Sequence, residues 1–150
     1  MSFERETHRR VAEYLNEFFD SPYHDEENGH FYVRYGSTVL EISVEAHGEE
    51  DAAVQLTAYC VQGVELVEEL LLGLLELNHQ LPFGSFSVVG NDIYFSYALF
   101  GRNLEPRALL AAVEAVATTS DEYDGRIVKK YGGQTALDRM RGKQPPANDG

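Results

Sequence analysis

The chain has 150 residues, 43% of them hydrophobic, and a formal net charge of −13. This length suits one ordinary domain with a core of its own. The first ten residues, MSFERETHRR, are strongly charged, and glutamates interrupt the leucine-rich run at 64–77. The sequence therefore predicts a soluble, cytoplasmic protein with neither a signal peptide nor a membrane helix.

The charge is unevenly distributed. No Lys or Arg occurs between Arg34 and Arg102, a stretch that holds ten carboxylates, whereas residues 126–143 hold six basic residues and only one acidic residue, Asp138. A field of this kind repels nucleic acid and anionic membranes and favours encounter with a basic partner or with a basic segment of another copy.

The first half of the chain predicts a helix followed by a hairpin. Apolar residues recur at helical spacing over residues 3–19, which is typical of an amphipathic helix. Two alternating runs, 31–35 and 38–46, are joined by the dipeptide Gly36-Ser37. A two-residue turn there pairs Tyr35 with Thr38 and places one apolar face against a core. That face consists of Phe31, Val33, Leu40, Ile42 and Val44.

A third strand is predicted at 53–61, with Val54, Leu56, Ala58 and Cys60 facing the same core. Cys60, the only cysteine, is interpreted as a small buried hydrophobe. The leucine-rich segment 63–81 then predicts a helix whose apolar arc spans about half of its circumference. Leu72 lies among the glutamates on the opposite side, which leaves two interpretations: an ordinary exposed leucine or a contact with another chain.

The segment 84–101, GSFSVVGNDIYFSYALFG, predicts a second hairpin around Gly90-Asn91, in which Val89 pairs with Asp92. Its core face collects Phe86, Val88, Ile93, Phe95, Tyr97 and Leu99. Most of its aromatic residues are thereby explained as core. The opposite face is smooth and carries a single tyrosine; its residues are Ser85, Ser87, Tyr94, Ser96 and Ala98.

A third helix is predicted from about Asn103, whose side chain would cap it, with Pro106 in the first turn. Its periodicity resumes after Ser120, and the pair Gly132-Gly133 suits a helix end. Residues 1–133 are therefore expected to form one domain. Residues 134–150 have few apolar anchors and predict a disordered basic tail.

Signatures of catalysis are scarce. The sequence has no phosphate-binding glycine loop, no G-x-S-x-G turn and no C-x-x-C or H-E-x-x-H motif. The best metal candidate is the loop with His24, Asp25, Glu26, Glu27 and His30, whose spacing matches no standard site, so a solvated loop is the preferred interpretation. We therefore expect no enzyme, metal or cofactor. A metal-dependent hydrolase built on this loop is kept as a minor alternative.

The element order is helix, three strands, helix, two strands, helix, which predicts an α+β domain with an antiparallel sheet covered by helices. This order resembles the type III secretion chaperone-like fold. The stretches LELNHQLPFGSFSVVGNDIYFSYALF and EPRALLAAVEAVATTSDEYDGRIVKKYGG are similar to the YbjN family. The resemblance implies a small acidic homodimer, related in shape to chaperones that hold unfolded segments of secreted proteins. It also implies a link to stress response or regulation.

The leading hypothesis is a non-enzymatic chaperone-like protein that binds a peptide segment of a protein partner. The segment would lie over Ser85, Ser87, Tyr94, Ser96 and Ala98, and the acidic flank would favour basic sequences. Dimerisation would use the second helix, through Leu72, Leu75, Glu69 and Glu76.

Two other binding modes stay open. In the first, the serine face is the dimer interface, and the first helix recognises the peptide through Tyr14, Phe18 and Phe19. In the second, the chain is a structural or adaptor subunit that docks on a larger assembly through its acidic face.

Overall fold

The computed structural model describes residues 2–136 and 138. Three helices and seven strands follow one another along this part of the chain. In chain order they are α1 (Phe3–Phe18), β1 (Tyr23–His24), β2 (Phe31–Tyr35), β3 (Thr38–Ala46), β4 (Ala52–Gln62), α2 (Glu68–Gln80), β5 (Ser85–Val89), β6 (Asp92–Phe100), α3 (Pro106–Tyr131) and β7 (Gln134–Thr135). No helix among the described residues is long and apolar enough to cross a membrane.

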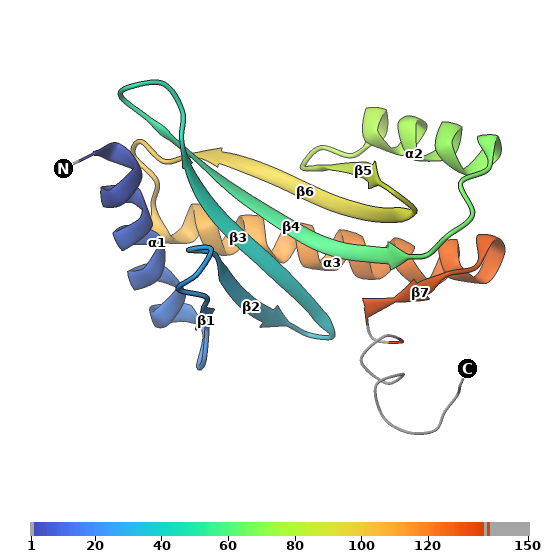
Figure 1. Ribbon diagram of the computed structural model, residues 1–150, viewed down its shortest axis with the longest axis horizontal. Helices are drawn as coiled ribbons and strands as arrows, with labels where there is room; N and C mark the ends of the chain where they lie inside the picture. The colour runs from blue at the N-terminus through green and yellow to red at the C-terminus, as the bar shows by residue number, and fades with distance from the viewer. Residues whose placement is uncertain (1, 137, 139–150) are drawn as a thin grey trace.

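The strands form one antiparallel sheet in the order β1-β2-β3-β4-β6-β5, and β7 pairs with the end of β4. Figure 1 shows α3 running along one face of this sheet, with α1 at one end and α2 beside β5 at the other. The α+β fold expected from the sequence is confirmed. Because the helices cover one face, no element of the described residues covers the opposite face of the sheet.

The two hairpins form in the expected register. Tyr35 pairs with Thr38, and Val89 pairs with Asp92. Gly36 and Gly90, the first residues of the two turns, have φ of 62° and 61°. A positive φ at this position is typical of the turn that matches the twist of hairpin strands, and glycine adopts it without steric cost.

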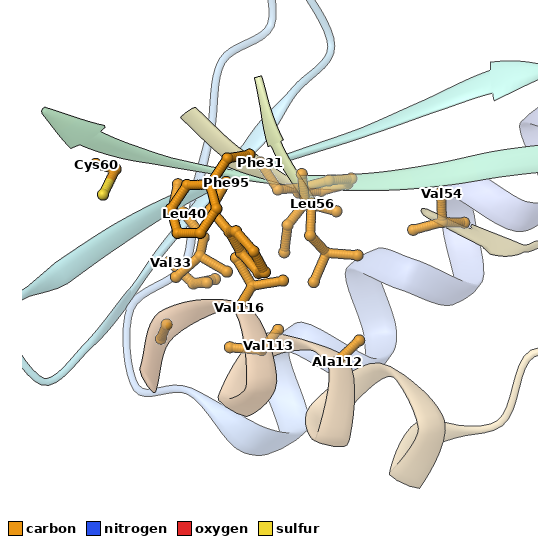
Figure 2. Close-up of a cluster of buried hydrophobic side chains, with 14 of the residues drawn as sticks. Phe31, Val33, Leu40, Val54, Leu56, Cys60, Phe95, Ala112, Val113 and Val116 are labelled. Atoms are coloured by element: carbon orange, nitrogen blue, oxygen red, sulfur yellow. The ribbon is translucent and has the colours of Figure 1, made fainter. Parts of the chain in front are cut away.

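The core lies between the sheet and α3. Figure 2 shows Phe95 and Leu40 of the sheet pointing toward Val113 and Val116 of α3, and all four side chains are fully buried. Cys60 is also buried, and this burial raises the pKa of its thiol to about 12. The thiol is therefore protonated at neutral pH, which confirms its role as a small hydrophobe.

The second helix begins at Glu68, five residues later than Gly63, where the sequence-based prediction placed its start. The reason is a non-helical connection that is held by the β5–β6 turn. The Val64 backbone N–H donates to Asn91 O at 2.9 Å, and Asn91 Nδ2 donates to Val64 O at 3.3 Å. Val64 is buried in this conformation, so the core contact outweighs the local helical pattern.

The third helix also differs from the prediction at its start. Its N-cap is Glu105, and Asn103 lies two residues earlier with a left-handed φ of 61°, so Asn103 does not cap the helix. From Pro106 the helix runs without a break to Tyr131. The expected interruption near Ser120 is absent because Ser120 is itself buried within the helix.

The glycine pair after α3 redirects the chain onto β4. Gly132 and Gly133 have φ of 90° and 91°, and a Cβ at Gly133 would lie 2.8 Å from Gln62 O. Only glycine fits this close approach. Gln134 and Thr135 then pair with β4, although the disordered tail was expected to begin at 134. The rest of that expected tail, apart from 136 and 138, lies outside the described residues.

Asp124 on α3 gives the fold a predictable pH dependence. Burial raises the pKa of its carboxyl to about 6, and the nearby charges of Asp121 and Asp138 act in the same direction. A raised carboxyl pKa destabilises the folded state above that pKa, and this cost disappears as the pH falls toward the unfolded value near 4. We therefore expect Asp124→Asn to raise the free energy of unfolding by about 1 kcal/mol at pH 7, a value reduced for solvent screening.

The measurement is urea denaturation of both proteins at pH 7 and pH 4. The stabilisation should be present at pH 7 and nearly absent at pH 4. A variant that is equally stabilised at both pH values would contradict the assignment of the effect to the ionised carboxylate.

Candidate functional site

The face of the sheet without helices, which we call the open face, carries the predicted peptide-binding residues. All five belong to β5 and β6, and all are half-buried or exposed: Ser85, Ser87, Tyr94, Ser96 and Ala98. Cross-strand pairing places Ser85 beside Ser96 and Ser87 beside Tyr94. The structure thus brings these side chains together on one surface.

The same surface continues over β4 and β3. Ser96 pairs with Thr57, and Thr57 pairs with Glu41. Tyr59 pairs with Tyr94, and their rings are 5.1 Å apart in an edge-to-face arrangement. The sequence-based prediction did not include Thr57, Tyr59 or Glu41, because the pairing of β4 with β6 spans the whole of α2.

Glu41 is the centre of a hydrogen-bonded cluster on the open face. Tyr32 Oη donates to Glu41 Oε2 at 3.1 Å, and Tyr59 Oη donates to Glu41 Oε1 at 3.1 Å. His30 Nδ1 also contacts Glu41 Oε2. Burial raises the pKa of Tyr59 to about 12, and the Glu41 charge acts in the same direction. Tyr59 therefore remains a hydrogen-bond donor at neutral pH, and the carboxylate is held in place.

Tyrosines extend this cluster across the sheet. The Tyr23 and Tyr32 rings are 6.0 Å apart on β1 and β2, and Tyr59 and Tyr94 continue the series on β4 and β6. Tyrosine combines a large apolar ring with a polar hydroxyl, which suits it to surfaces that contact both side chains and backbone of a ligand. We refer to Tyr23, Tyr32, Tyr59 and Tyr94 as the tyrosine row.

The open face is acidic on its central strands. Strands β3, β4, β5 and β6 all lie within the stretch that has no Lys or Arg, and they present Glu41, Glu45 and Asp92. Arg34 on β2 is exposed and marks one boundary of this region. The centre of the open face therefore carries negative charge.

The predicted dimer residues lie on α2, but they do not share one environment. Leu72 and Leu75 are 51% and 64% exposed. Glu69, by contrast, forms an ion pair with Lys130 at 2.6 Å and accepts a hydrogen bond from Tyr131 Oη at 2.8 Å. Glu76 is exposed. The two leucines thus point to solvent, whereas Glu69 connects α2 with α3.

The histidine-rich loop does not bring its candidate metal ligands together. The His24 ring stacks on Phe31, with centroids 4.8 Å apart, and also contacts His8 of α1. His30 contacts Glu41 on the open face. Across residues 2–136 and 138, no group of three or more His, Cys, Asp or Glu side chains is placed to hold a metal ion.

The alternative site on the first helix is divided by the fold. Tyr14 Oη donates to Leu104 O at 3.1 Å and so faces the α3 side of the molecule. Phe18 and Phe19 instead line a cavity of about 430 Å³ together with Pro22 and Val33. The three aromatic residues therefore do not form a single recognition surface.

Comparison with known proteins agrees with this architecture. A chain in the crystal structure of the ExsC-ExsE complex superposes with a TM-score of 0.66 at 15% sequence identity, covering 85% of this chain and 97% of that chain. Comparison with curated proteins finds no match. The family model of TY-Chap1, described as T3SS (YopN, CesT) and YbjN peptide-binding chaperone 1, matches residues 5–139. The expected resemblance is confirmed, and the chain belongs to this family of peptide-binding chaperones.

Proposed function

We propose that the chain is a non-enzymatic chaperone that holds an extended segment of a partner protein against its open face. The observation that carries this proposal is a sheet face without a helical cover that presents the tyrosine row beside small side chains. Its membership of a family of peptide-binding chaperones agrees with this role.

The chemistry of the face suits a peptide. Ser85, Ser87 and Ser96 are small, so a ligand backbone can approach the sheet closely, and their hydroxyls offer hydrogen bonds. Tyr59 and Tyr94 supply ring surface at a small cost in side-chain entropy. Glu41, with its position fixed by Tyr32 and Tyr59, supplies a negative charge for a Lys or Arg of the ligand.

We further propose that the protein works in the cytoplasm as a homodimer, and that residues 1–133, together with Gln134 and Thr135 of β7, form its single folded domain. The leucines Leu72 and Leu75 of α2 support the dimer, because each is more than half exposed and exposed apolar side chains on a helix favour association with another chain. An adaptor that docks only through its acidic charge would be distinguished by its salt dependence, since such binding weakens steeply with ionic strength.

The test centres on Tyr94. Affinity capture of the tagged protein from extract of its own cells, with quantitative mass spectrometry, identifies the partner, and overlapping 15-residue peptides of that partner locate the bound segment. We expect Tyr94→Glu to weaken binding of this segment by about tenfold or more, because the new carboxylate removes ring contact and adds charge to be desolvated. Fluorescence anisotropy measures the affinity.

Tyr94→Phe is the matched control, because it keeps the ring and removes only the hydroxyl. It should bind within about threefold of the original protein. Equal affinity of the Tyr94→Glu protein, with an unchanged circular dichroism spectrum, would exclude the open face around β6 as the binding site. Dissociation of a dimer into folded monomers on the same substitution would instead assign this face to dimerisation.

A further inference from the structure

The last residues of β6 extend beyond the strand that borders them. β5 pairs with β6 only from Asp92 to Ser96, whereas β4 pairs with β6 as far as Phe100. Figure 1 shows the half of β6 near its arrowhead with β4 on one side and no strand on the side where β5 lies. The segment from Tyr97 to Phe100 is therefore an open sheet edge, which we call the β6 edge.

The register shows which backbone groups face this edge. Gly101 N–H donates to Ala52 O at 2.7 Å, so the residues of β6 that direct their backbone groups toward β4 include Leu99 and Tyr97. The alternate residues, Ala98 and Phe100, direct their N–H and C=O groups away from β4. An added strand would find a donor and an acceptor on each of these two residues.

The β6 edge borders an apolar groove on the helix side, and an apolar hollow lies over β4 and β6 on the open face. On the helix side, a groove of about 260 Å³ is lined by Phe83, Tyr97, Leu99, Ala108, Ala111 and Ala115. On the open face, a second hollow of about 200 Å³ is lined by His47, Ala53, Ala98, Leu99 and Phe100. Successive side chains of a strand point to opposite faces, so a strand on this edge would direct alternate side chains into the helix-side groove and the others toward the acidic open face.

The groove exists because α3 presents small residues where it passes β6. Ala108 and Ala111 are exposed, and beside them Leu99 is only half-buried. Phe83 forms the rim; it is 54% exposed, and its ring lies 5.9 Å from that of Tyr97. On the other face Phe100 is 68% exposed. Large apolar side chains at an unpaired edge are typical of a place where another strand binds.

The charges around the edge define its occupant. Glu45 pairs with Ala53, which in turn pairs with Phe100, so a carboxylate lies in the same cross-strand row as the open-face hollow. Arg102, the nearest cation in the sequence, is already bound to Glu50 and Asp51 through its side chain and backbone. On the helix side Arg107 of α3 is exposed next to Ala108, so it is on the open-face side that the surroundings of the edge favour basic residues in the bound segment.

We propose that an extended segment of the partner protein adds to β6 at Tyr97–Phe100 as a further strand, in line with β5. In this segment apolar residues, which enter the helix-side groove, alternate with basic residues, which lie toward the open face, and its backbone pairs with Ala98 and Phe100. This inference rests on the proposed peptide-binding function and specifies how part of the ligand is held.

The probe is a fluorescent nine-residue peptide of alternating lysine and valine. We expect this peptide to bind and to slow hydrogen exchange of the Ala98 and Phe100 amides. The Ala98→Pro protein lacks one outward N–H, so it should bind the peptide about tenfold more weakly. Ala98→Ser keeps that N–H, so it should bind the peptide more tightly than Ala98→Pro does. The same peptide with alternate amides N-methylated should bind at least about tenfold more weakly.

A second pair of variants tests the groove independently of the backbone. Ala111→Tyr fills the groove from an exposed position of α3 and should also weaken binding by about tenfold, whereas Thr118→Tyr makes a similar change on the same helix outside the groove and should leave binding unchanged. These variants keep the test valid if Ala98→Pro impairs folding.

Four results would overturn the inference. The first two are no binding of the peptide at millimolar concentration and equal binding of the N-methylated peptide. The others are full binding by a folded Ala111→Tyr protein and a dimer that dissociates in the edge variants while peptide affinity is unchanged. The last result would assign the edge to a second copy. Loss of binding with Tyr94→Glu alone would leave the proposed function intact without the edge. Loss with the edge variants alone would support the edge and exclude the open face.

Discussion

Replacing Phe95 with alanine is expected to lower the free energy of unfolding by about 3–5 kcal/mol, the range typical of a large aromatic truncation in a packed core. Phe95 is fully buried, and its ring lies 4.8 Å from that of Phe86. A Cβ at Gly84 would come within 2.5 Å of Phe95 Cε2, so the ring fills its space on this side as well. Urea denaturation followed by circular dichroism measures the change.

Val88 provides the matched control, because the hairpin pattern assigns it to the same sheet face as Phe95. In the structure it is 37% exposed, and we expect Val88→Ala to cost less than about 1 kcal/mol. Comparable losses for the two substitutions would mean that the helices cover the end of β5 more completely than they do in this structure.

The contrast between Phe95 and Val88 shows what alternation can predict. A two-residue turn fixes which residues pair, and so Phe86, Ile93 and Phe95 were assigned correctly to the core face. Alternation does not say how far a helix extends over that face. Tyr97 is only half-buried for the same reason, because the helix that passes it presents alanines.

The candidate site was predictable only where it lies within one hairpin. Ser85, Ser87 and Tyr94 follow from the register around Gly90, which is a local feature. Tyr59 and Glu41 lie on strands that precede α2, and nothing local in the sequence shows that β4 pairs with β6. The tyrosine row therefore depends on strand order, which arises from the packing of the whole domain.

The start of α2 illustrates a second limit. Residues 64–67 fit the helical pattern of leucines and glutamates, yet they are not helical in the structure. The competing interaction is a contact of Val64 with Asn91, 27 positions further along the chain. Helical propensity is worth only tenths of a kcal/mol per residue, so burial of one valine and two hydrogen bonds outweighs it.

Two leucines of α2 are largely exposed. Leu72 and Leu75 are more than half exposed, and Leu71 and Val89 are also exposed, whereas Leu70 and Leu74 on the inner side of the same helix are buried. The inner side of α2 thus packs against the domain, whereas Leu75 of the predicted apolar arc and Leu72, which lies outside that arc, are available to a partner. A second copy of the chain is the partner that we propose.

Leu75→Glu, and likewise Leu72→Glu, is expected to raise the dimer dissociation constant by about a hundredfold or more. Burial of one leucine contributes about 1.5–3 kcal/mol, and each substitution occurs twice in a symmetric interface. Light scattering and sedimentation measure the oligomeric state at micromolar concentration. Gln80→Glu adds the same charge to an exposed position of α2 away from these leucines and should leave the dimer intact. A monomeric original protein, or a dimer unaffected by both leucine variants, would contradict an interface on α2.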